Sequence, residues 1–193
     1  MQETGGSKSH LTLFDTGPDS RSLIRNVKSM QVPVANIERV IISHWHADHS
    51  GGLLSFLNLR GASESPCIID LHPDRPTARG IAPPPNFNKP WCRLPPDPTF
   101  KLIEDAGGKV EKSKEGHVVA DGTVWVSGEI PRTTSFEVGM PGAIRYFEKD
   151  GSGFWGKEEV CCVFPIQKPI ALIFGSISWM NDMLVSMSLA KDS

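Results

Sequence analysis

VIISHWHADHSGG, residues 40–52, places four metal-binding side chains within six positions, directly after an apolar run. In an extended segment, residues two positions apart point the same way, so His44 and His46 can present two imidazoles to one cation. Asp48 and His49 follow where the chain turns toward two glycines, and there a second pair of ligands can face a second cation. The spacing therefore predicts a paired metal site at the end of a β-strand.

The ligand types of this cluster favour zinc, with iron or manganese as alternatives. Imidazole and carboxylate together do not select a single metal. A histidine-rich surface turn is the other interpretation of the same six residues. The position of the cluster favours the metal site, because binding residues gather where a strand ends in a loop.

Alternating β-type and α-type patterns surround the cluster. Apolar, β-branched runs predict strands over residues 11–14, 40–43 and 67–71. Apolar positions at helical spacing predict helices over residues 51–60 and over residues 20–30, with Asp19 or Ser20 as the cap of the latter. Further on, the pattern predicts a short helix over residues 99–106 and a hairpin of residues 118–119 and 123–126, joined by Asp121-Gly122. This succession of strands and helices indicates an α/β fold.

A proline-rich segment interrupts this pattern, with nine prolines in the 26 residues of segment 73–98. Proline lacks an amide donor and fixes its own backbone angle, so we expect an irregular loop there, over the mouth of the site. Trp91 and Arg93 lie in this loop. Contact with a substrate and simple packing both remain open for these two side chains.

The motif and its surroundings resemble the metallo-β-lactamase-fold superfamily, in which H-x-H-x-D-H ends a strand and a glycine-opened helix follows. Residues 11–17 (LTLFDTG) are similar to the upstream strand of that family, and Ile42-Ser43 leads into the motif as it does there. Residues 127–132 (SGEIPR), with Phe136-Glu137 after them, resemble a narrower branch, the dihydropterin ribofuranosyl-aminobenzene phosphate synthase-like proteins. Together these matches cover about residues 8–160.

The resemblance implies a metallo-β-lactamase-like αββα sandwich in incomplete form, with the second half largely missing. It divides the chain into a partial metallo-β-lactamase domain at residues 1–160 and an atypical C-terminal tail at residues 161–193. The tail does not look like family sequence, and we expect it to arise from alternative splicing, intron read-through or a gene-model error. Its apolar stretch, residues 170–190, raises the question of a membrane anchor, but Asn181 and Asp182 interrupt it.

The resemblance also assigns roles to the motif. His44 and His46 would help to bind one metal ion, and Asp48 and His49 the other, with two zinc ions per site expected and iron or manganese as alternatives. Asp48 is also the expected catalytic residue, orienting the attacking water. Asp15 would hydrogen-bond a liganding imidazole and fix its tautomer. For Asp15, an ordinary turn residue in Asp-Thr-Gly is the equally open alternative.

The implied chemistry is attack by a metal-activated water on a small phosphorylated or acyl substrate. Glu129 and Arg132 are candidate substrate-binding residues, since an arginine can hold a phosphate by two parallel hydrogen bonds; a structural ion pair is equally open. Two reactions compete, a condensation that forms the pterin-ribofuranosyl product and hydrolysis of an ester, a lactam or a thioester, the last as in glyoxalase II. A catalytically inactive metal-binding fragment is the third alternative.

Members of the family need further ligands from downstream strands: another histidine, a bridging carboxylate and a last histidine near the C-terminus. Only His72 and His117 follow the motif. We expect neither to bind metal, His72 being a satisfied or exposed residue before the proline-rich loop and His117 part of a surface turn. Whether the chain is an enzyme therefore stays open in the sequence.

The composition limits the partners. The chain has 193 residues, 39% hydrophobic and 22% charged, as is ordinary for a soluble domain. A formal net charge of -2 without a basic stripe argues against nucleic acid and membranes, so we expect a small-molecule substrate. Four cysteines without disulfide spacing, and no signal peptide, indicate the cytoplasm. The oligomeric state stays open.

Overall fold

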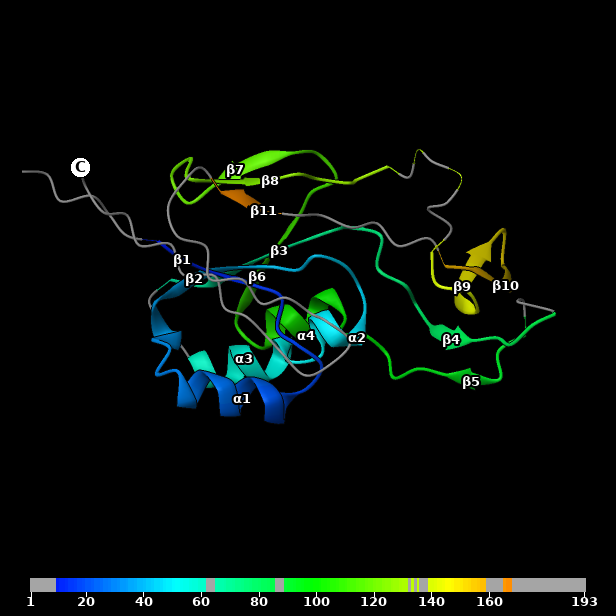
Figure 1. The fold of residues 1–193 in the computed structure, drawn as a ribbon, viewed down its shortest axis with the longest axis horizontal. Coiled ribbons are helices and arrows are strands. Elements are labelled where there is room, and N and C mark those ends of the chain that lie inside the picture. The colour runs from blue at the N-terminus through cyan, green and yellow to red at the C-terminus, as the bar shows by residue number, and fades with distance from the viewer. Residues whose placement is uncertain are drawn as a thin grey trace, which may run out of the picture.

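The computed structural model describes residues 10–61, 65–85, 89–131, 133, 135, 139–158 and the backbone of 165–167. Over these residues the fold is mixed α/β, as predicted. A parallel sheet lies between a layer of helices and a small antiparallel sheet, and a third sheet lies to one side (Figure 1).

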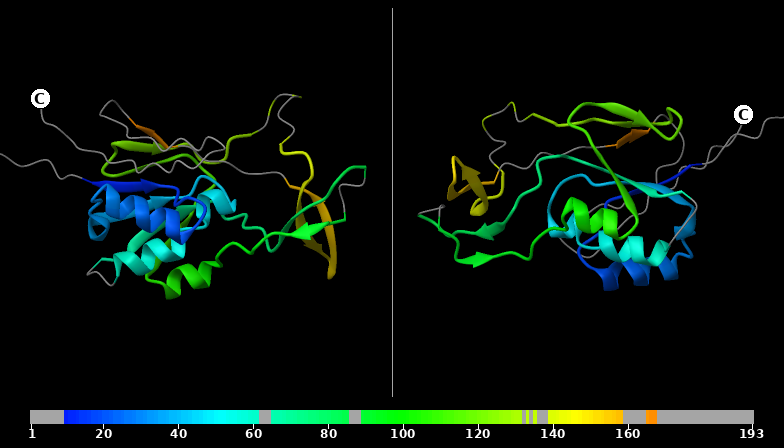
Figure 2. Two further views of the ribbon diagram at one scale, coloured as in Figure 1. Left: turned by 60° about the horizontal axis from the view of Figure 1, so that its bottom comes forward. Right: turned by 180° about the vertical axis from the view of Figure 1, so that it is seen from behind.

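The parallel sheet has the strand order β1-β2-β3-β6, with β1 at Leu11–Phe14, β2 at Ile37–Ile41, β3 at Cys67–Leu71 and β6 at Gly108–Lys112. The helical segments between these strands are α1 (Ser20–Ser29), the 3-10 turn η1 (Val34–Asn36), α2 (Ala47–Ser50), α3 (Leu53–Arg60) and α4 (Phe100–Asp105). Crossovers of one hand between successive parallel strands place their helices on one face of the sheet. Helices α1, α3 and α4 do lie together on one face (Figure 2).

The main core lies between this sheet and its helices. Asp19 caps α1 by accepting hydrogen bonds from the backbone N–H groups of Arg21 and Ser22. Leu23 and Val27, one helical turn apart, are buried in the core. Each fully buried aliphatic side chain contributes about 1.5–3 kcal/mol to folding. The packing of this face of α1 against the sheet therefore helps to hold the ends of the strands in place.

A second core lies on the other face of the parallel sheet. There β7 (His117–Val119), β8 (Val124–Val126) and β11 (Pro165–Gln167) form an antiparallel sheet of order β11-β8-β7. Ile41 of β2 packs with Val119, Val124 and Val126 from this sheet. The predicted hairpin is confirmed, and Asp121-Gly122 lies at its turn with both φ angles positive.

The third sheet corrects the expectation that segment 73–98 is irregular. It is antiparallel with the order β10-β9-β4-β5, formed by β4 (Arg79–Ile81), β5 (Cys92–Arg93), β9 (Ala143–Lys149) and β10 (Ser152–Lys157). Two of these strands lie inside the proline-rich segment. The prolines flank β4 and β5 and do not occupy them, so the backbone donors of both strands remain available for pairing.

The remaining predicted helices and strands agree with the structure to different extents. The strands over residues 11–14 and 67–71 and the first helix are confirmed, while the strand predicted at 40–43 begins earlier, at Ile37, and ends at Ile41. The helix predicted over residues 51–60 is confirmed as α3, which begins at Leu53, after Gly51-Gly52. The short helix α2 before these glycines was not predicted. Strands β6, β9 and β10 were not predicted. Except for residues 165–167, the predicted tail lies outside the described residues.

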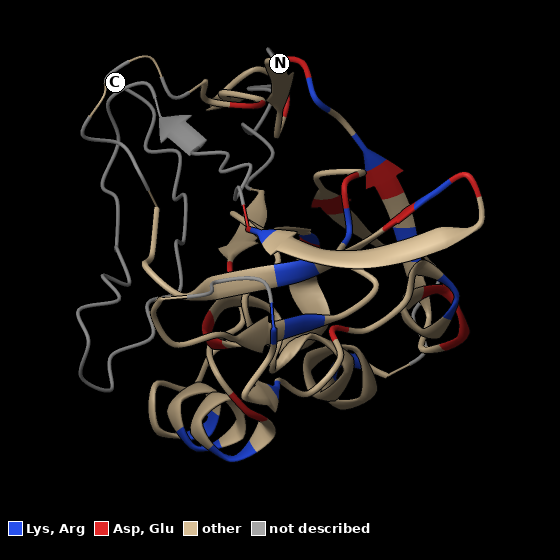
Figure 3. Ribbon diagram, turned by 90° about the vertical axis from the view of Figure 1, so that its right-hand side faces the viewer, with Lys and Arg blue, Asp and Glu red and all other residues tan. Residues whose placement is uncertain are grey.

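No helix in the described part of the chain is long and apolar enough to cross a lipid bilayer. The apolar stretch of residues 170–190, for which a membrane anchor was considered, lies outside that part. Charged residues of both signs are interspersed along the strands and helices of the face shown in Figure 3.

Candidate metal centre

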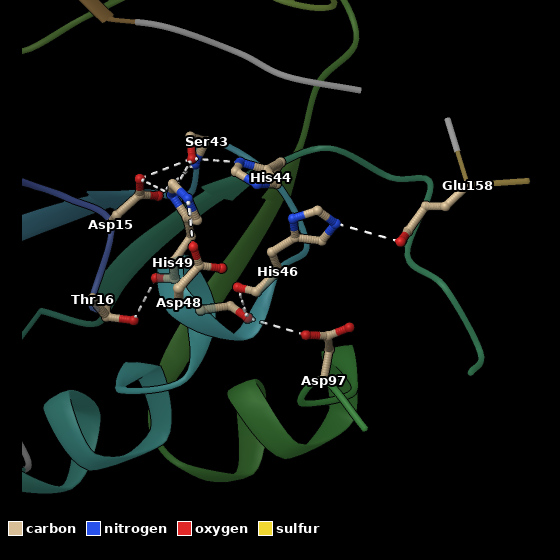
Figure 4. A network of polar contacts seen from close by, with 10 residues as sticks. Asp15, Thr16, Ser43, His44, His46, Asp48, His49, Asp97 and Glu158 are labelled. Carbon is tan, nitrogen blue, oxygen red and sulfur yellow. Dashed lines mark hydrogen bonds and ion pairs between the residues drawn. The ribbon is translucent and has the colours of Figure 1, made fainter. Parts of the chain in front are cut away.

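The motif residues gather at the carboxyl ends of two neighbouring parallel strands (Figure 4). Asp15 directly follows β1, and Ser43 and His44 follow β2. The carboxyl ends of adjacent parallel strands meet at one edge of a sheet, which is where open α/β sheets bind ligands. The remaining motif residues lie on or beside α2, which begins after His46.

Two glycines allow the loop after β1 to lie against the motif. A Cβ atom on Gly51 would collide with the carbonyl oxygen of Pro18, and one on Gly52 with that of Thr16. Thr16 in turn binds the motif, because its N–H and its hydroxyl donate to the carbonyl oxygen of His49 at 2.7 and 2.9 Å. The Gly-Gly pair is therefore needed for the close approach that fixes His49.

Asp15 connects the two strand ends. Its backbone has φ 57°, a left-handed conformation that aspartate tolerates better than most residues. The buried carboxylate accepts from the N–H of Ser43 at 2.7 Å, from the Ser43 hydroxyl at 2.8 Å and from Nδ1 of His49 at 2.7 Å. The hydrogen bond to an imidazole that was expected of Asp15 is present; the role of that imidazole as a ligand stays a prediction.

These hydrogen bonds assign the tautomers of two histidines. An ionised carboxylate only accepts, so His49 carries its proton on Nδ1. The Ser43 hydroxyl has one proton, which it donates to Asp15, and its oxygen then accepts from Nδ1 of His44 at 3.0 Å. In the neutral form of each ring, Nε2 is then the nitrogen without a proton, which is the form in which histidine binds a metal.

The three imidazoles of the motif lie against one another. The ring centroid of His44 is 3.9 Å from that of His49 and 4.6 Å from that of His46. Burial lowers the pKa of His44 to about 2, with smaller effects from His49, His46 and Arg79. His44 is therefore neutral at physiological pH.

Glu158 joins this group from the third sheet, and the sequence analysis did not identify it. Its Oε2 atom lies 3.4 Å from Nε2 of His46, and its side chain is buried. Its backbone N–H donates to the carbonyl of Ala143, which continues the pairing of β10 with β9. The Glu158-Glu159 pair was the signal in the sequence that could have indicated this downstream carboxylate.

Asp48 lies at the solvent side of the cluster. Its side chain is 54% exposed, and its Oδ2 atom is 3.5 Å from Nε2 of His49. Asp48 therefore lies beside Nε2 of His49 and is exposed to solvent. The four predicted motif ligands are thus adjacent in the structure, and their binding of a metal stays a prediction.

The other predicted residues lie elsewhere. His72 is buried and hydrogen-bonded, which agrees with the expectation of a satisfied histidine and not with that of an exposed one. Its ring contacts Glu129 at 3.3 Å and the N–H of Asp74 at 3.1 Å. The surface turn predicted at His117 is wrong: this residue starts β7, and its Nε2 lies 2.8 Å from Asp70. Arg132 lies outside the described residues.

The chemistry of the donor set fits a zinc ion. Within the described residues, no group of three or more His, Cys, Asp and Glu side chains is arranged to hold a metal ion as it stands. The donors themselves are suitable, because His44 is neutral, His49 is held in one tautomer by Asp15, and carboxylates adjoin His46 and His49. These five residues are therefore the ones that would hold it: His44, His46, Asp48, His49 and Glu158.

Comparison with known proteins identifies the relatives of the chain. The family model described as "Metallo-beta-lactamase superfamily" matches residues 6–133. The crystal structure of Tm1679, described as a metal-dependent hydrolase of the β-lactamase superfamily, is similar with a TM-score of 0.53 and 16% identity, over 85% of this chain and 55% of that one. Rm3 metallo-β-lactamase aligns with a TM-score of 0.39 and 20% identity, over 78% of this chain and 51% of that one.

The likeness to Tm1679 concerns the fold alone. This chain spans about half the length of the two solved structures. The comparison with curated proteins gives no match.

Proposed function

Because the chain belongs to the metallo-β-lactamase superfamily, we propose that it is a metal-dependent hydrolase of a small phosphorylated or acyl substrate. One observation carries the proposal: three imidazoles gather at the carboxyl end of the parallel sheet, with one tautomer fixed by Asp15 and carboxylates beside two of the rings. Such a set of donors matches the chemistry of a hydrolytic metal site.

The positions of the side chains suggest which residues would bind each metal ion. His44 and His46 would hold one ion, and Asp48 and His49 a second, with Glu158 contributing from the side of His46. Zinc is the proposed metal, with iron or manganese as alternatives. When bound, the metal acidifies a water molecule and stabilises negative charge on the reacting centre.

Asp48 is the proposed catalytic residue. Its side chain is exposed, whereas those of His44, His46 and His49 are only partly exposed, so it can contact both a water molecule and a substrate. It would accept a hydrogen bond from the attacking water and orient it toward the electrophilic centre. Asp15, being buried and bonded to Ser43 and His49, would act only by holding His49 in place.

A finer proposal concerns the substrate. Residues 127–132 resemble the dihydropterin ribofuranosyl-aminobenzene phosphate synthase-like branch, and within them Glu129 contacts His72, which follows β3 at the same edge of the sheet as the motif. This position supports Glu129 as a candidate contact for a phosphorylated substrate, and Arg132 is a candidate on the resemblance alone. The transferase-type condensation of that branch is the corresponding reaction.

The proposed setting is the cytoplasm, with a small molecule as partner and neither nucleic acid nor a membrane. Of the cysteines in the described residues, Cys67 and Cys92 are free thiols, as a reducing compartment would maintain them. The formal net charge of -2 gives no general attraction to a polyanion.

The experiment compares the metal-loaded 193-residue chain with its Asp48→Ala variant in the hydrolysis of bis-p-nitrophenyl phosphate and of a small thioester. We expect turnover by the parent and a loss on the order of 10²–10⁴ in the variant, the usual contribution of a residue that handles a proton. Asp105→Ala is the matched control, because that side chain is 55% exposed, close to the 54% of Asp48, and belongs to an exposed ion pair.

Two outcomes would decide against the hydrolase. Retained activity in the Asp48→Ala variant would remove the proposed mechanism. A parent that binds metal tightly yet turns over neither substrate would favour the second candidate, a metal-binding protein without catalysis.

A further inference from the structure

Three charged side chains are buried together behind His46. Arg79 lies on β4, Asp97 precedes α4, and Glu158 follows β10. Each of these side chains is only 4% exposed. Burying a charge is unfavourable unless a partner compensates it, so the contacts within the group determine how its members lie.

The contacts form a ring that begins and ends at His46. Arg79 donates two hydrogen bonds of 2.9 Å to Asp97, from Nε and Nη2, and its Nε lies 3.9 Å from Oε1 of Glu158. The other oxygen of Glu158 lies 3.4 Å from His46. The hydroxyl of Ser50 is within hydrogen-bonding distance of both Asp97, at 3.2 Å, and the carbonyl oxygen of His46, at 3.1 Å (Figure 4).

The ring joins two parts of the molecule that lie apart. Glu158 and Arg79 belong to the third sheet, which is set to one side of the parallel sheet in every view (Figures 1 and 2). Asp97 belongs to the segment that leads into α4, beneath the parallel sheet, and Arg75 also binds that segment through the carbonyl oxygens of Asp97 and Pro98. The Arg79–Asp97 pair therefore connects the third sheet, close to the motif, to the segment that leads into α4.

A contribution to overall stability does not explain why Arg79 and Asp97 form a buried ion pair. Replacing a buried ion pair by apolar side chains of similar size is often neutral or stabilising, so the pair is weak evidence of a stabilising function. A forked arginine fixes direction as well as distance, because its two N–H groups bind a carboxylate in one plane. The geometry is thus suited to placing a neighbouring group.

We propose that Arg79, held by Asp97, is a positioning residue that places the Glu158 carboxylate against His46 and so raises the metal affinity of the site. The inference rests on the proposed function, since it assumes that the motif binds metal. Arg79 itself would contact neither metal nor substrate and would act only through Glu158. Replacing Arg79 should therefore not change the metal affinity further once the Glu158 carboxylate has been removed.

The test is a double-mutant cycle read out by Co²⁺ binding. The 193-residue chain, its variants Arg79→Gln and Glu158→Gln, and the double variant are titrated with Co²⁺ and followed by visible absorption. The melting temperature of each protein is measured without metal. We expect Arg79→Gln and Glu158→Gln each to weaken Co²⁺ binding about 10–100-fold, as is usual for groups that orient or supply ligands. The double variant should bind no more weakly than Glu158→Gln alone.

Two further variants complete the design. Arg39→Gln removes another arginine that is paired with a nearly buried aspartate, Asp70, and should leave Co²⁺ affinity unchanged. Arg79→Lys keeps the charge but loses the fork, and should bind Co²⁺ with an affinity between those of the parent and Arg79→Gln. It also serves as the test variant if Arg79→Gln does not fold.

The outcomes separate the two proposals. A folded parent that binds no Co²⁺ would refute the proposed function and this inference with it. If the parent binds Co²⁺ and every folded Arg79 variant binds equally well, the inference alone is wrong. If the losses from Arg79→Gln and Glu158→Gln multiply in the double variant, Arg79 acts independently of Glu158, and the positioning role is refuted.

Discussion

Replacing Asp15 by asparagine would test how the site fixes its histidines. Asparagine has the shape of aspartate and tolerates the left-handed backbone at this position, where φ is 57°. Its amide oxygen can still accept from the Ser43 N–H, but its NH₂ group would face Nδ1 of His49 and the Ser43 hydroxyl. To accept from that NH₂ group, His49 must move its proton to Nε2, the nitrogen proposed to bind metal.

The magnitude follows from three hydrogen bonds. Each bond to a charged acceptor contributes about 1.5–3 kcal/mol, against about 0.5–1.5 kcal/mol for a neutral pair. Weakening the three bonds of Asp15 should lower the free energy of unfolding by about 3–4.5 kcal/mol, less than the total stability of a domain of ordinary stability. The change of tautomer at His49 should lower zinc affinity about 10–100-fold.

Urea unfolding and competitive titration with a zinc-binding dye measure the two effects separately. Asp19→Asn is the matched control, because Asp19 also accepts backbone hydrogen bonds but lies at the exposed start of α1, and asparagine caps a helix as well as aspartate does. The control should change neither quantity. Unchanged zinc affinity in a folded Asp15→Asn variant would refute the argument that Asp15 sets the tautomer of His49.

Three further predictions concern other parts of the molecule. The hydrogen bond to Glu38 raises the pKa of His10 above 6.5, so the stability it contributes is complete below pH 6.5 and is lost as the pH rises through the raised value. Urea unfolding across this range should show a steeper decline for the parent than for His10→Gln. Gly51→Ala should lower the free energy of unfolding by about 2 kcal/mol or more, because its Cβ would collide with a carbonyl oxygen. Burial raises the pKa of the Cys67 thiol to about 11, so alkylation followed by mass spectrometry should modify exposed Cys92 before Cys67.

Each of these predictions has an outcome that contradicts it. Parallel pH profiles for the parent and His10→Gln would show that the ion pair does not form. For the glycine, Gly107→Ala is the control, since its Cβ would meet nothing within 4 Å and the cost is only the strain of its positive φ, about 1–2 kcal/mol. An equal loss in both variants would argue against the collision at Gly51. Simultaneous alkylation of both cysteines would show that Cys67 is accessible.

The parts of the fold that follow local rules could be predicted from the sequence. The apolar run of β3 and the Asp19 cap of α1 are local features, and both elements are confirmed. The turn at Asp121-Gly122 predicted the β7-β8 hairpin. The same rule would have found the β9-β10 hairpin, because Asp150-Gly151 forms its turn with φ values of 52° and 75°.

The site could be predicted only as far as the motif extends. His44, His46, Asp48 and His49 are close in sequence, and an α/β pattern places them at a strand end. Glu158 lies 112 residues after His46, and Asp97 lies 47 residues after Ser50; both arrive through tertiary structure that has no sequence pattern of its own. The pairing of β4 inside a proline-rich segment, which positions Arg79, was likewise outside the reach of local rules.

A count of metal ions per chain tests the account most directly. The 193-residue chain is stripped of metal with a chelator, reloaded with zinc, freed of excess metal and analysed by plasma emission beside a His44→Ala/His49→Ala double variant. The account predicts two zinc ions per parent chain and clear loss in the double variant while helical content is retained. A folded parent that retains neither zinc, iron nor manganese would contradict it.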